Sequence, residues 1–419
     1  MRARLVVLSE VVTMVAACGT VSSTGGSRAA TPSPLPSTGS PAPSPTVGPS
    51  IVGRSTAPAP SPSASPSATP ILLLPSGSVP PISTAPWTGL RLGPLKGGPV
   101  SASSVVAWSG GYLALGQPTG ISPLPAWVSR NGRSWVQLPT DTFPAASSTL
   151  AAPCADGIVV AIESATGDRT IWRSTDGVTW TSSPLSQMRV ARDSDLAGSP
   201  RGTVAVLDGP PPRLSFTRDG AAWRTMSLPG SPALRVQGVA ALADGFVAVG
   251  DAGANDAGRT PESPVAWWSA DGVHWNLAAV QAHPGDGFYS AQAGRSGLVA
   301  SSTTVGAVPG LGSFWTSPDG RSWKVSAADP LDVFGEGEGM GSAAGDFSGD
   351  GTRLLGYGTR AAGGPPEYWV SFDANHWTRL ALTGDSAAAA AGQTAPFLLR
   401  DGVLFSGEHG SWFGTASHG

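Results

Sequence analysis

Short runs of apolar residues, each introduced by a turn residue, recur along the C-terminal three quarters of the chain. Gly111–Gly116 and Asp244–Gly250 show the form: aspartate or glycine, then an apolar run, then a closing glycine. The form occurs seven times, and Asp401–Gly407 is the last copy. Apolar runs of this length bounded by turn residues are typical of buried β-strands. The pattern therefore predicts an all-β fold.

A second pattern follows each of the first six strands. It consists of serine, any residue, aspartate, glycine, two further residues and tryptophan, as in Ser174–Trp180. Asn131, Thr217 and Ala374 are single departures from it. A pattern repeated in one register indicates a repeat architecture. The other copies are Ser129–Trp135, Thr217–Trp223, Ser269–Trp275, Ser317–Trp323 and Ser371–Trp377.

The two ends of the chain each carry part of one further repeat. After Asp401–Gly407 the chain reaches Gly419 without another Asp-Gly turn. At the other end, Pro86-Trp87-Thr88 matches His376-Trp377-Thr378, the stretch that follows the sixth turn. A repeat begun at the C-terminus and completed at the N-terminus closes a ring and removes exposed sheet edges.

The repeat length identifies the ring. Successive closing tryptophans lie 43 to 54 residues apart, and four short strands per unit of roughly 48 residues is the β-propeller period. We expect one seven-bladed β-propeller over residues 87–419. Residues 86–92 should form the outermost strand of the last blade, and its three inner strands should come from about Ala390 to Phe413.

The repeated turn resembles the Asp-box, or bacterial neuraminidase repeat, whose usual form is Ser-x-Asp-x-Gly-x-Thr-Trp. Here one residue fewer separates the aspartate from the tryptophan. The resemblance covers residues 87–419 and implies a sialidase-like propeller. It also implies that the turns lie between the third and fourth strands of each blade, on the face opposite the usual binding site. The Asp-box positions are Asn131, Asp176, Asp219, Asp271, Asp319 and Asp373.

We interpret the turn residues as structural. The carboxylate can accept backbone N–H bonds across the turn, and the serine or threonine hydroxyl can bind the same loop. Glycine permits a positive φ. The tryptophan can wedge between neighbouring blades as a large apolar plate. The predicted inter-blade tryptophans are Trp87, Trp135, Trp180, Trp223, Trp275, Trp323 and Trp377.

The N-terminal residues predict a secretory signal. Arg2 and Arg4 precede an apolar stretch from Leu5 to Ala17, which is too short to span a bilayer. Its end, Val15-Ala16-Ala17-Cys18, resembles a bacterial lipobox. That resemblance implies a signal peptide over residues 1–17, lipidation of Cys18 and an extracytoplasmic protein held at the cell membrane by its lipid. An ordinary signal with an incidental cysteine is the alternative.

Residues 18–86 should form a disordered linker that starts at the lipidated cysteine. The stretch is rich in proline, serine, threonine and alanine, and it contains no acidic residue. Such a composition cannot bury enough apolar surface to offset the chain entropy. The linker would hold the propeller clear of the lipid surface.

Composition excludes several classes of function. Only 13% of residues are charged and the net charge is −3, so nucleic-acid binding through a basic face is not expected. The two cysteines, Cys18 and Cys154, exclude a disulfide framework and a cysteine-rich metal site. Asp346–Gly351 resembles the start of a calcium loop, but Tyr357 stands where the bidentate glutamate belongs. We therefore predict no metal and no cofactor.

Charged residues on the loops opposite the turns are the candidates for ligand binding. Carboxylates and arginines converging on a central funnel would suit a polar or sugar-like ligand, and scattered solvated charges are the alternative. The candidates are Glu163, Asp168, Arg169, Arg189, Arg192, Asp193, Asp195, Asp251, Asp256, Arg259, Glu262, His283, Asp286, Glu336, Glu338, Arg360 and Glu367.

The sequence favours a non-catalytic function. Enzymes of the sialidase family use three arginines, a Tyr–Glu pair and an aspartic acid; of the four tyrosines here, only Tyr289 lies next to a blade-linking loop on the candidate face, and no Tyr–Glu pair can be assigned. We expect a monomeric, envelope-anchored lipoprotein whose propeller binds a protein or glycan ligand opposite the turns. The alternative is a secreted glycan-active hydrolase of sialidase-like type.

Overall fold

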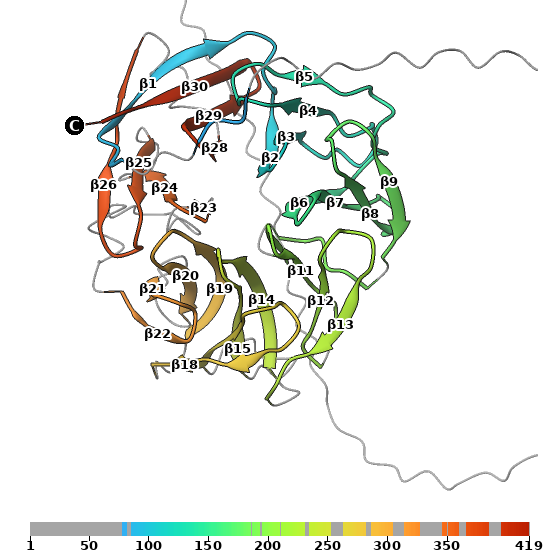
Figure 1. Ribbon diagram of the computed structural model, residues 1–419, viewed down its shortest axis with the longest axis vertical. Helices are drawn as coiled ribbons and strands as arrows, with labels where there is room; N and C mark the ends of the chain where they lie inside the picture. Colours follow the sequence, from blue (N-terminus) through green and yellow to red (C-terminus); the bar gives the residue numbers. More distant parts are fainter. Residues whose placement is uncertain are drawn as a thin grey trace, which may run out of the picture. The chain divides into compact units, whose positions relative to one another are not determined.

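The structure is a computed structural model. It describes residues 78–81, 85–185, 187–192, 195–209, 211–230, 234–252, 263–281, 286–304, 314–326, 346–349, 351–359, 366–384 and 395–418. All of these residues belong to the unit Thr69–Gly419. They contain thirty β-strands arranged in seven sheets around a ring (Figure 1). The predicted signal peptide, Cys18 and most of the linker lie outside the described residues.

The first four blades are four-stranded antiparallel sheets, each starting with its innermost strand. Their strands are β2 (Ala102–Trp108), β3 (Gly111–Gly116), β4 (Ala126–Ser129) and β5 (Val136–Gln137); β6 (Ser148–Cys154), β7 (Gly157–Glu163), β8 (Arg169–Ser174) and β9 (Thr181–Pro184); β10 (Leu196–Ser199), β11 (Gly202–Val206), β12 (Arg213–Thr217) and β13 (Arg224–Ser227); β14 (Leu234–Ala241), β15 (Phe246–Ala252), β16 (Ser263–Ser269) and β17 (Asn276–Leu277).

The remaining three blades follow the same order. Blade 5 contains β19 (Asp286–Ala293), β20 (Leu298–Thr304), β21 (Phe314–Ser317) and β22 (Ser322–Val325), with β18 (Ala279–Val280) added outside. Blade 6 contains β23 (Asp346–Gly349), β24 (Leu354–Thr359), β25 (Pro366–Ser371) and β26 (Trp377–Arg379). Blade 7 contains β28 (Ala395–Leu399), β29 (Gly402–Gly407), β30 (Gly410–Ser417) and β1 (Gly89–Leu95), with β27 (Ala381–Thr383) added outside.

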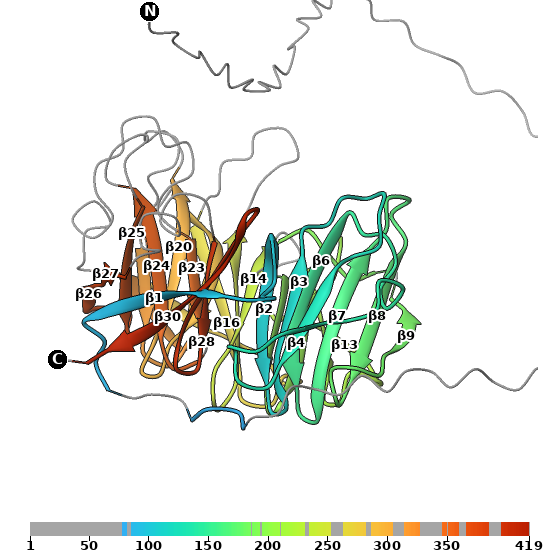
Figure 2. The same cartoon turned by 90° about the horizontal axis from the view of Figure 1, so that it is seen from above.

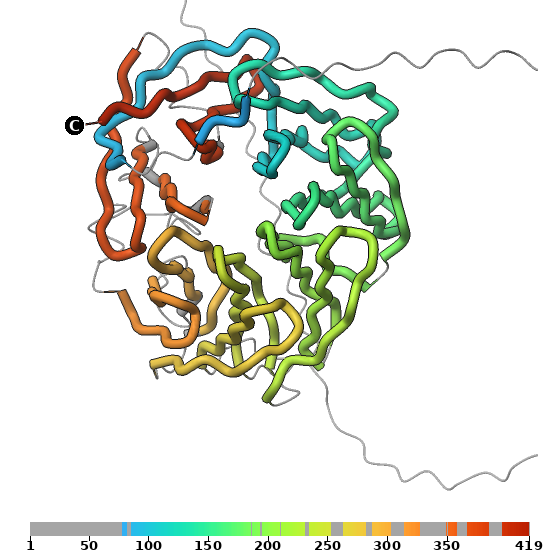
Figure 3. Tube along the Cα trace, viewed as in Figure 1, coloured from blue at the N-terminus to red at the C-terminus, as the bar shows by residue number. Residues whose placement is uncertain are grey.

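The ring closes through the split blade, as the sequence predicts. β1 pairs antiparallel with β30 over its whole length, from Gly89 opposite Ser417 to Leu95 opposite Ser411. β1 and β30, which come from the two ends of the propeller, therefore lie side by side in one sheet (Figure 3). The innermost strands of neighbouring blades contact one another all the way round, from β2 through β28 and back to β2. The prediction of seven blades with split closure is confirmed, but the closing strand is Gly89–Leu95 instead of residues 86–92, and it is not the outermost strand because β27 pairs outside it.

Two blades differ from the expected four strands. In blade 7, β27 pairs in parallel with the outside of β1, and in blade 5, β18 pairs in parallel with the outside of β22. Each of these short strands directly follows the outer strand of the preceding blade, so the chain crosses from one sheet to the next. The crossing covers part of an otherwise open sheet edge.

The core lies between the blades. Among the residues that the structure describes, buried apolar side chains form seven clusters, and each cluster combines residues from two adjacent blades. The strands run between two faces of the ring (Figure 2). We call the face with the repeated turns the turn face. The opposite face carries the loops between second and third strands and the links between blades, and we call it the loop face.

Candidate functional site

On the turn face, the six repeated turns share the hydrogen bonds to the serine or threonine hydroxyl and to the Asp-box side chain. In the second copy, Ser174 Oγ accepts from Gly177 N at 2.8 Å, and Asp176 Oδ1 accepts from Val178 N at 2.8 Å and Thr179 N at 2.7 Å. The tryptophan at the end, Trp180, donates its Nε1–H to the glycine carbonyl. Equivalent bonds to the Asp-box side chain occur at Asn131, Asp219, Asp271, Asp319 and Asp373.

These bonds stabilise the charged form of the carboxylate. The backbone N–H of Ala221 holds the pKa of Asp219 below its usual value, against the opposing effect of burial. Burial raises the pKa of Asp271, but the hydrogen bonds from His274 and Val273 outweigh it and the net shift is downward. The Asp-box residues act on their own turns.

Each closing tryptophan packs against the preceding blade. Trp135 lies in the cluster between blades 7 and 1, and Trp323 lies in the cluster between blades 4 and 5. Trp87 is the most deeply buried of the seven, at 1% exposed, and lies between blades 6 and 7. Trp180, Trp223, Trp275 and Trp377 occupy the corresponding positions at four further blade contacts.

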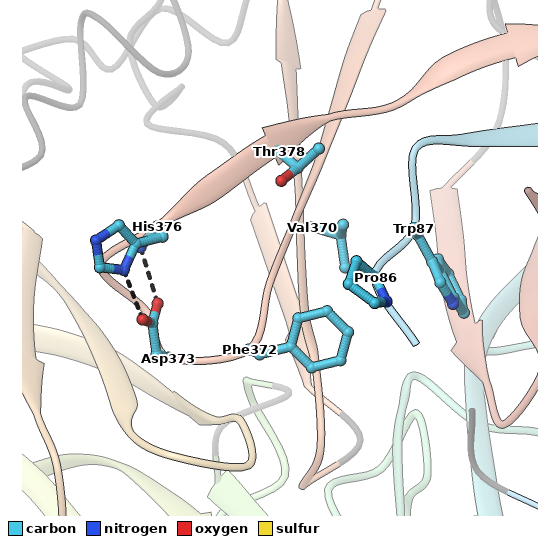
Figure 4. Close-up of a pocket in the computed structure, with 7 residues that line it drawn as sticks. All are labelled: Pro86, Trp87, Val370, Phe372, Asp373, His376 and Thr378. Atoms are coloured by element: carbon cyan, nitrogen blue, oxygen red, sulfur yellow. Dashed lines mark hydrogen bonds and ion pairs between the residues drawn. The ribbon is translucent and has the colours of Figure 1, made fainter. Parts of the chain in front are cut away.

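A shallow pocket of about 190 Å³ lies beside the sixth turn (Figure 4). Asp373 and His376 form one side, with 2.6 Å between Asp373 Oδ2 and His376 Nδ1, and Pro86 and Trp87 form the other. The hydrogen bond to Asp373 raises the pKa of His376. Asp271 and His274 form the same pair in blade 4. The pair therefore belongs to the turn rather than to the pocket.

On the loop face, blades 2 and 3 share one arginine. Arg169 donates its Nε–H to Glu163 Oε2 at 2.6 Å, and its terminal N–H to the carboxylate of Asp208. Glu163 ends the second strand of blade 2, and Asp208 lies in the loop that follows the second strand of blade 3. The two carboxylates bind one guanidinium, whereas a glycosidase needs two carboxyl groups that face a substrate.

The link into blade 3 contains a buried carboxylate. Asp195 is fully buried; its carboxylate accepts from Arg189 Nε at 2.7 Å and from the backbone N–H groups of Ala191 and Arg192. Arg189 also donates to the backbone oxygens of Val236 and Gln237, at 3.0 and 3.1 Å, in the innermost strand of blade 4. These bonds fix the link against the neighbouring blade.

A chain of polar contacts lies beside this link, at the loop-face end of the inner strands, which we call the mouth of the ring. Arg192 donates to Gln237 Oε1 at 2.5 Å, and Gln237 Nε2 donates to Asp251 Oδ2 at 2.7 Å. The Arg192 guanidinium lies 4.5 Å from the centre of the Tyr289 ring in blade 5. Asp251 is 7% exposed, and this burial raises its pKa despite the opposing effects of Gln237 and the nearby arginines. We call Arg192, Gln237, Asp251 and Tyr289 the mouth network.

Of the predicted loop-face residues, Arg192 and Asp251 lie in the mouth network, and Arg189 and Asp195 support it. Glu163 and Arg169 form the separate ion pair, Asp168 accepts from Thr166 within its own loop, and Glu367 pairs with Arg379. Asp193, Asp256, Arg259, Glu262, His283, Glu336, Glu338 and Arg360, and the side chain of Asp286, lie outside the described residues.

Sequence reasoning missed Gln237 because it considered only charged loop residues. A signal was present: Gln237 is a large polar residue in an inner-strand run that is otherwise apolar, Val236–Leu242. Within the described residues, no group of three or more His, Cys, Asp or Glu side chains is placed to hold a metal ion. No helix among them has the length and apolar character needed to cross a membrane.

Comparison with known proteins bears on the fold alone. No family model and no curated protein matches the sequence. Solved structures with similar folds include YCF48 bound to D1 peptide, at 12% identity over 81% of this chain and 98% of that chain with a TM-score of 0.43. The β-propeller domain of the trilobed protease from Pyrococcus furiosus matches at 8% identity, 79% and 94% coverage and a TM-score of 0.44. A lectin from Aleuria aurantia in complex with α-methyl-L-fucoside matches at 13% identity over 74% of this chain and 98% of that chain, with a TM-score of 0.39.

Proposed function

We propose that the protein is an envelope-anchored lipoprotein whose propeller binds a protein or glycan ligand at the loop face. The mouth network supports this proposal. It places a guanidinium, an amide and a partly exposed aromatic ring from three consecutive blades next to one another. Polar groups held in fixed directions beside an exposed ring are typical of ligand sites. The lipobox-like end of the signal supports the anchoring.

The supporting bonds make the network suitable for binding. Asp195 and Arg189 hold the link that carries Arg192, and Asp251 orients the Gln237 amide so that its oxygen faces Arg192. Side chains held in this way lose little conformational entropy when a ligand arrives. The network therefore resembles a preorganised binding surface.

The test is affinity capture from the cell envelope with the full-length protein. The double variant Arg192→Ala/Tyr289→Ala should capture at least about tenfold less ligand than wild type, because both side chains of the contact are removed. Arg321→Ala is the matched control, since Arg321 lies 4.3 Å from the Trp268 ring in a similar pair beside the repeated turn of blade 5. Melting temperatures of the variants report folding.

The control variant should capture as much ligand as wild type. Equal capture by wild type and the double variant would place the ligand elsewhere on the propeller and reject the proposal.

A glycan-active hydrolase is the second candidate, and the burial of the Asp251 carboxyl group favours it. A buried carboxyl group with a raised pKa can remain protonated and serve as a general acid. This candidate predicts that the wild type releases 4-methylumbelliferone from a panel of umbelliferyl glycosides and that Asp251→Asn abolishes the release. No release by the wild type would reject it.

A further inference from the structure

Three innermost strands carry a β-bulge at the same position of the repeat. The pairing register shifts between Ala102 and Ser104 in β2, between Val236 and Gly238 in β14, and between Phe288 and Ser290 in β19. The bulged residues, Ser103, Gln237 and Tyr289, stand at equal distances before the glycines Gly111, Gly245 and Gly297 of their repeats. The bulge is therefore a feature of the repeat and not a local irregularity.

A bulge leaves one residue without a partner in the ladder and turns its side chain away from the regular alternation. In blade 5 the effect is plain from burial. Phe288 is 1% exposed and packs between blades, whereas the adjacent Tyr289 is 46% exposed. In blade 4 the carbonyl of the bulged Gln237 accepts a bond from Arg189, which satisfies a backbone group that the bulge removes from regular pairing.

The bulges bring two side chains of adjacent blades to one place. The innermost strands β14 and β19 contact each other, and both bulges lie near the strand ends that enter from the loop face. Arg192 touches both bulged residues, through a hydrogen bond to Gln237 and through its position over the Tyr289 ring. The result is an aromatic ring flanked by planar hydrogen-bonding groups at the mouth of the ring.

Resting on the proposed function, we infer that the ligand at this mouth is a neutral saccharide, one of whose rings stacks on Tyr289 while its hydroxyls bond to Arg192 and Gln237. The C–H face of a sugar ring is apolar and packs on an aromatic side chain, and adjacent hydroxyls match the paired donors and acceptors of guanidinium and amide groups. One terminal N–H of Arg192 donates to Gln237, and a guanidinium carries four further N–H groups that can donate to hydroxyls.

The experiment applies the full-length protein to an array of neutral and acidic oligosaccharides and then titrates any retained oligosaccharide by calorimetry. Tyr289→Ala should weaken binding by about tenfold or more, and Tyr289→Phe, which keeps the ring, by less than about threefold. Arg192→Lys should also cost about tenfold, because lysine lacks the planar fork. Arg321→Ala, on the turn face, should bind as wild type does.

Three outcomes would overturn the inference. Retention of acidic oligosaccharides alone would make the ligand class wrong. An affinity for neutral saccharide that survives Tyr289→Ala would place the sugar at another site. An array that retains nothing, while envelope capture still depends on Arg192 and Tyr289, would leave the proposed function intact and assign the mouth to a protein partner. Capture independent of these residues would reject the proposed function itself.

Discussion

The glycine of the repeated turn meets two separate demands. Gly320 has φ of 78°, and a Cβ at this position would lie 2.2 Å from Val247 Cγ2 in the preceding blade. Gly220 and Gly272 show the same combination, with contacts at 2.5 and 2.4 Å. The turn therefore needs glycine both for its backbone and for the close approach of two blades.

The sixth turn shows how the sequence departs from this rule. Ala374 adopts φ of 65° and is 1% exposed, inside the cluster between blades 5 and 6. At this interface the packing has room for a methyl group, so only the backbone strain of about 1–2 kcal/mol remains.

Replacing Gly320 with alanine should destabilise the protein by about 2–4 kcal/mol. This value adds two costs. An alanine in the left-handed backbone conformation costs about 1–2 kcal/mol, and its methyl group is forced against the β-branched side chain of Val247. Gly93→Ala is the control, because nothing lies within 4 Å of a Cβ there, and its effect should stay near 0.5 kcal/mol or below. Urea unfolding of both variants measures the difference. Coincident unfolding curves would contradict the packing argument.

Among the elements, β1 completes a blade that the rest of the chain leaves open. It lies between β30 and β27 and pairs with both. Just before it, Trp87 is buried under the guanidinium of Arg353, at 4.2 Å from the ring centre. Arg353 also donates to the carbonyl of Leu399 in blade 7 at 2.8 Å. The short segment of Trp87 and β1 thus joins blades 6 and 7.

Deleting residues 86–92 should destabilise the whole ring. The deletion removes most of β1 and the buried Trp87, and loss of a large buried aromatic side chain alone costs about 3–5 kcal/mol. For a domain of this size, that loss alone should lower the melting temperature by roughly 5 °C, and loss of the β1 ladder should lower it further. Calorimetry of the purified variant measures it.

The control is removal of residues 19–70, which lie outside the described residues and which the composition predicts to be disordered. That truncation should leave the melting temperature within about 2 °C of wild type. Equal melting temperatures for the two truncations would contradict the stabilising role of β1.

In the molecule as a whole, the ring and the proposed anchor use different parts of the chain. The described residues build the propeller, and the lipid attachment is proposed for Cys18. The loop-face contacts depend on the assembled ring, because the mouth network joins the link before blade 3 to the inner strands of blades 4 and 5.

Replacing Cys18 with serine should move the protein from the membrane fraction into the medium, or leave its signal uncut, because the lipid is the expected anchor. Immunoblots of fractionated cells measure both results. Cys154→Ser is the control: this thiol is buried in blade 2, where burial raises its pKa, and the variant should stay in the membrane fraction. If Cys18→Ser fractionates and migrates as wild type does, the anchoring proposal is wrong.

The sequence by itself determined the number of blades and the split closure. These features rest on patterns within each repeat: apolar strands, a turn defined by serine, aspartate and glycine, and a tryptophan at a fixed offset. Such patterns act through local backbone preferences and through burial of one face, so they are readable from neighbouring residues. The unmatched repeat fragments at the two ends also identified which strand closes the ring.

Only the tertiary structure decided which polar residues meet. Arg192 and Tyr289 are far apart in sequence, and they touch because blade stacking places the link before β10 beside β14 and β19. The β-bulges that expose Gln237 and Tyr289 depend on pairing register, which the sequence pattern of a single strand does not specify. The same holds for β18 and β27, which leave their own blades to cover the edge of the next one. The meeting of Arg192 with Gln237 and Tyr289, and the places of β18 and β27, arise from contacts between repeats, and no single repeat encodes them.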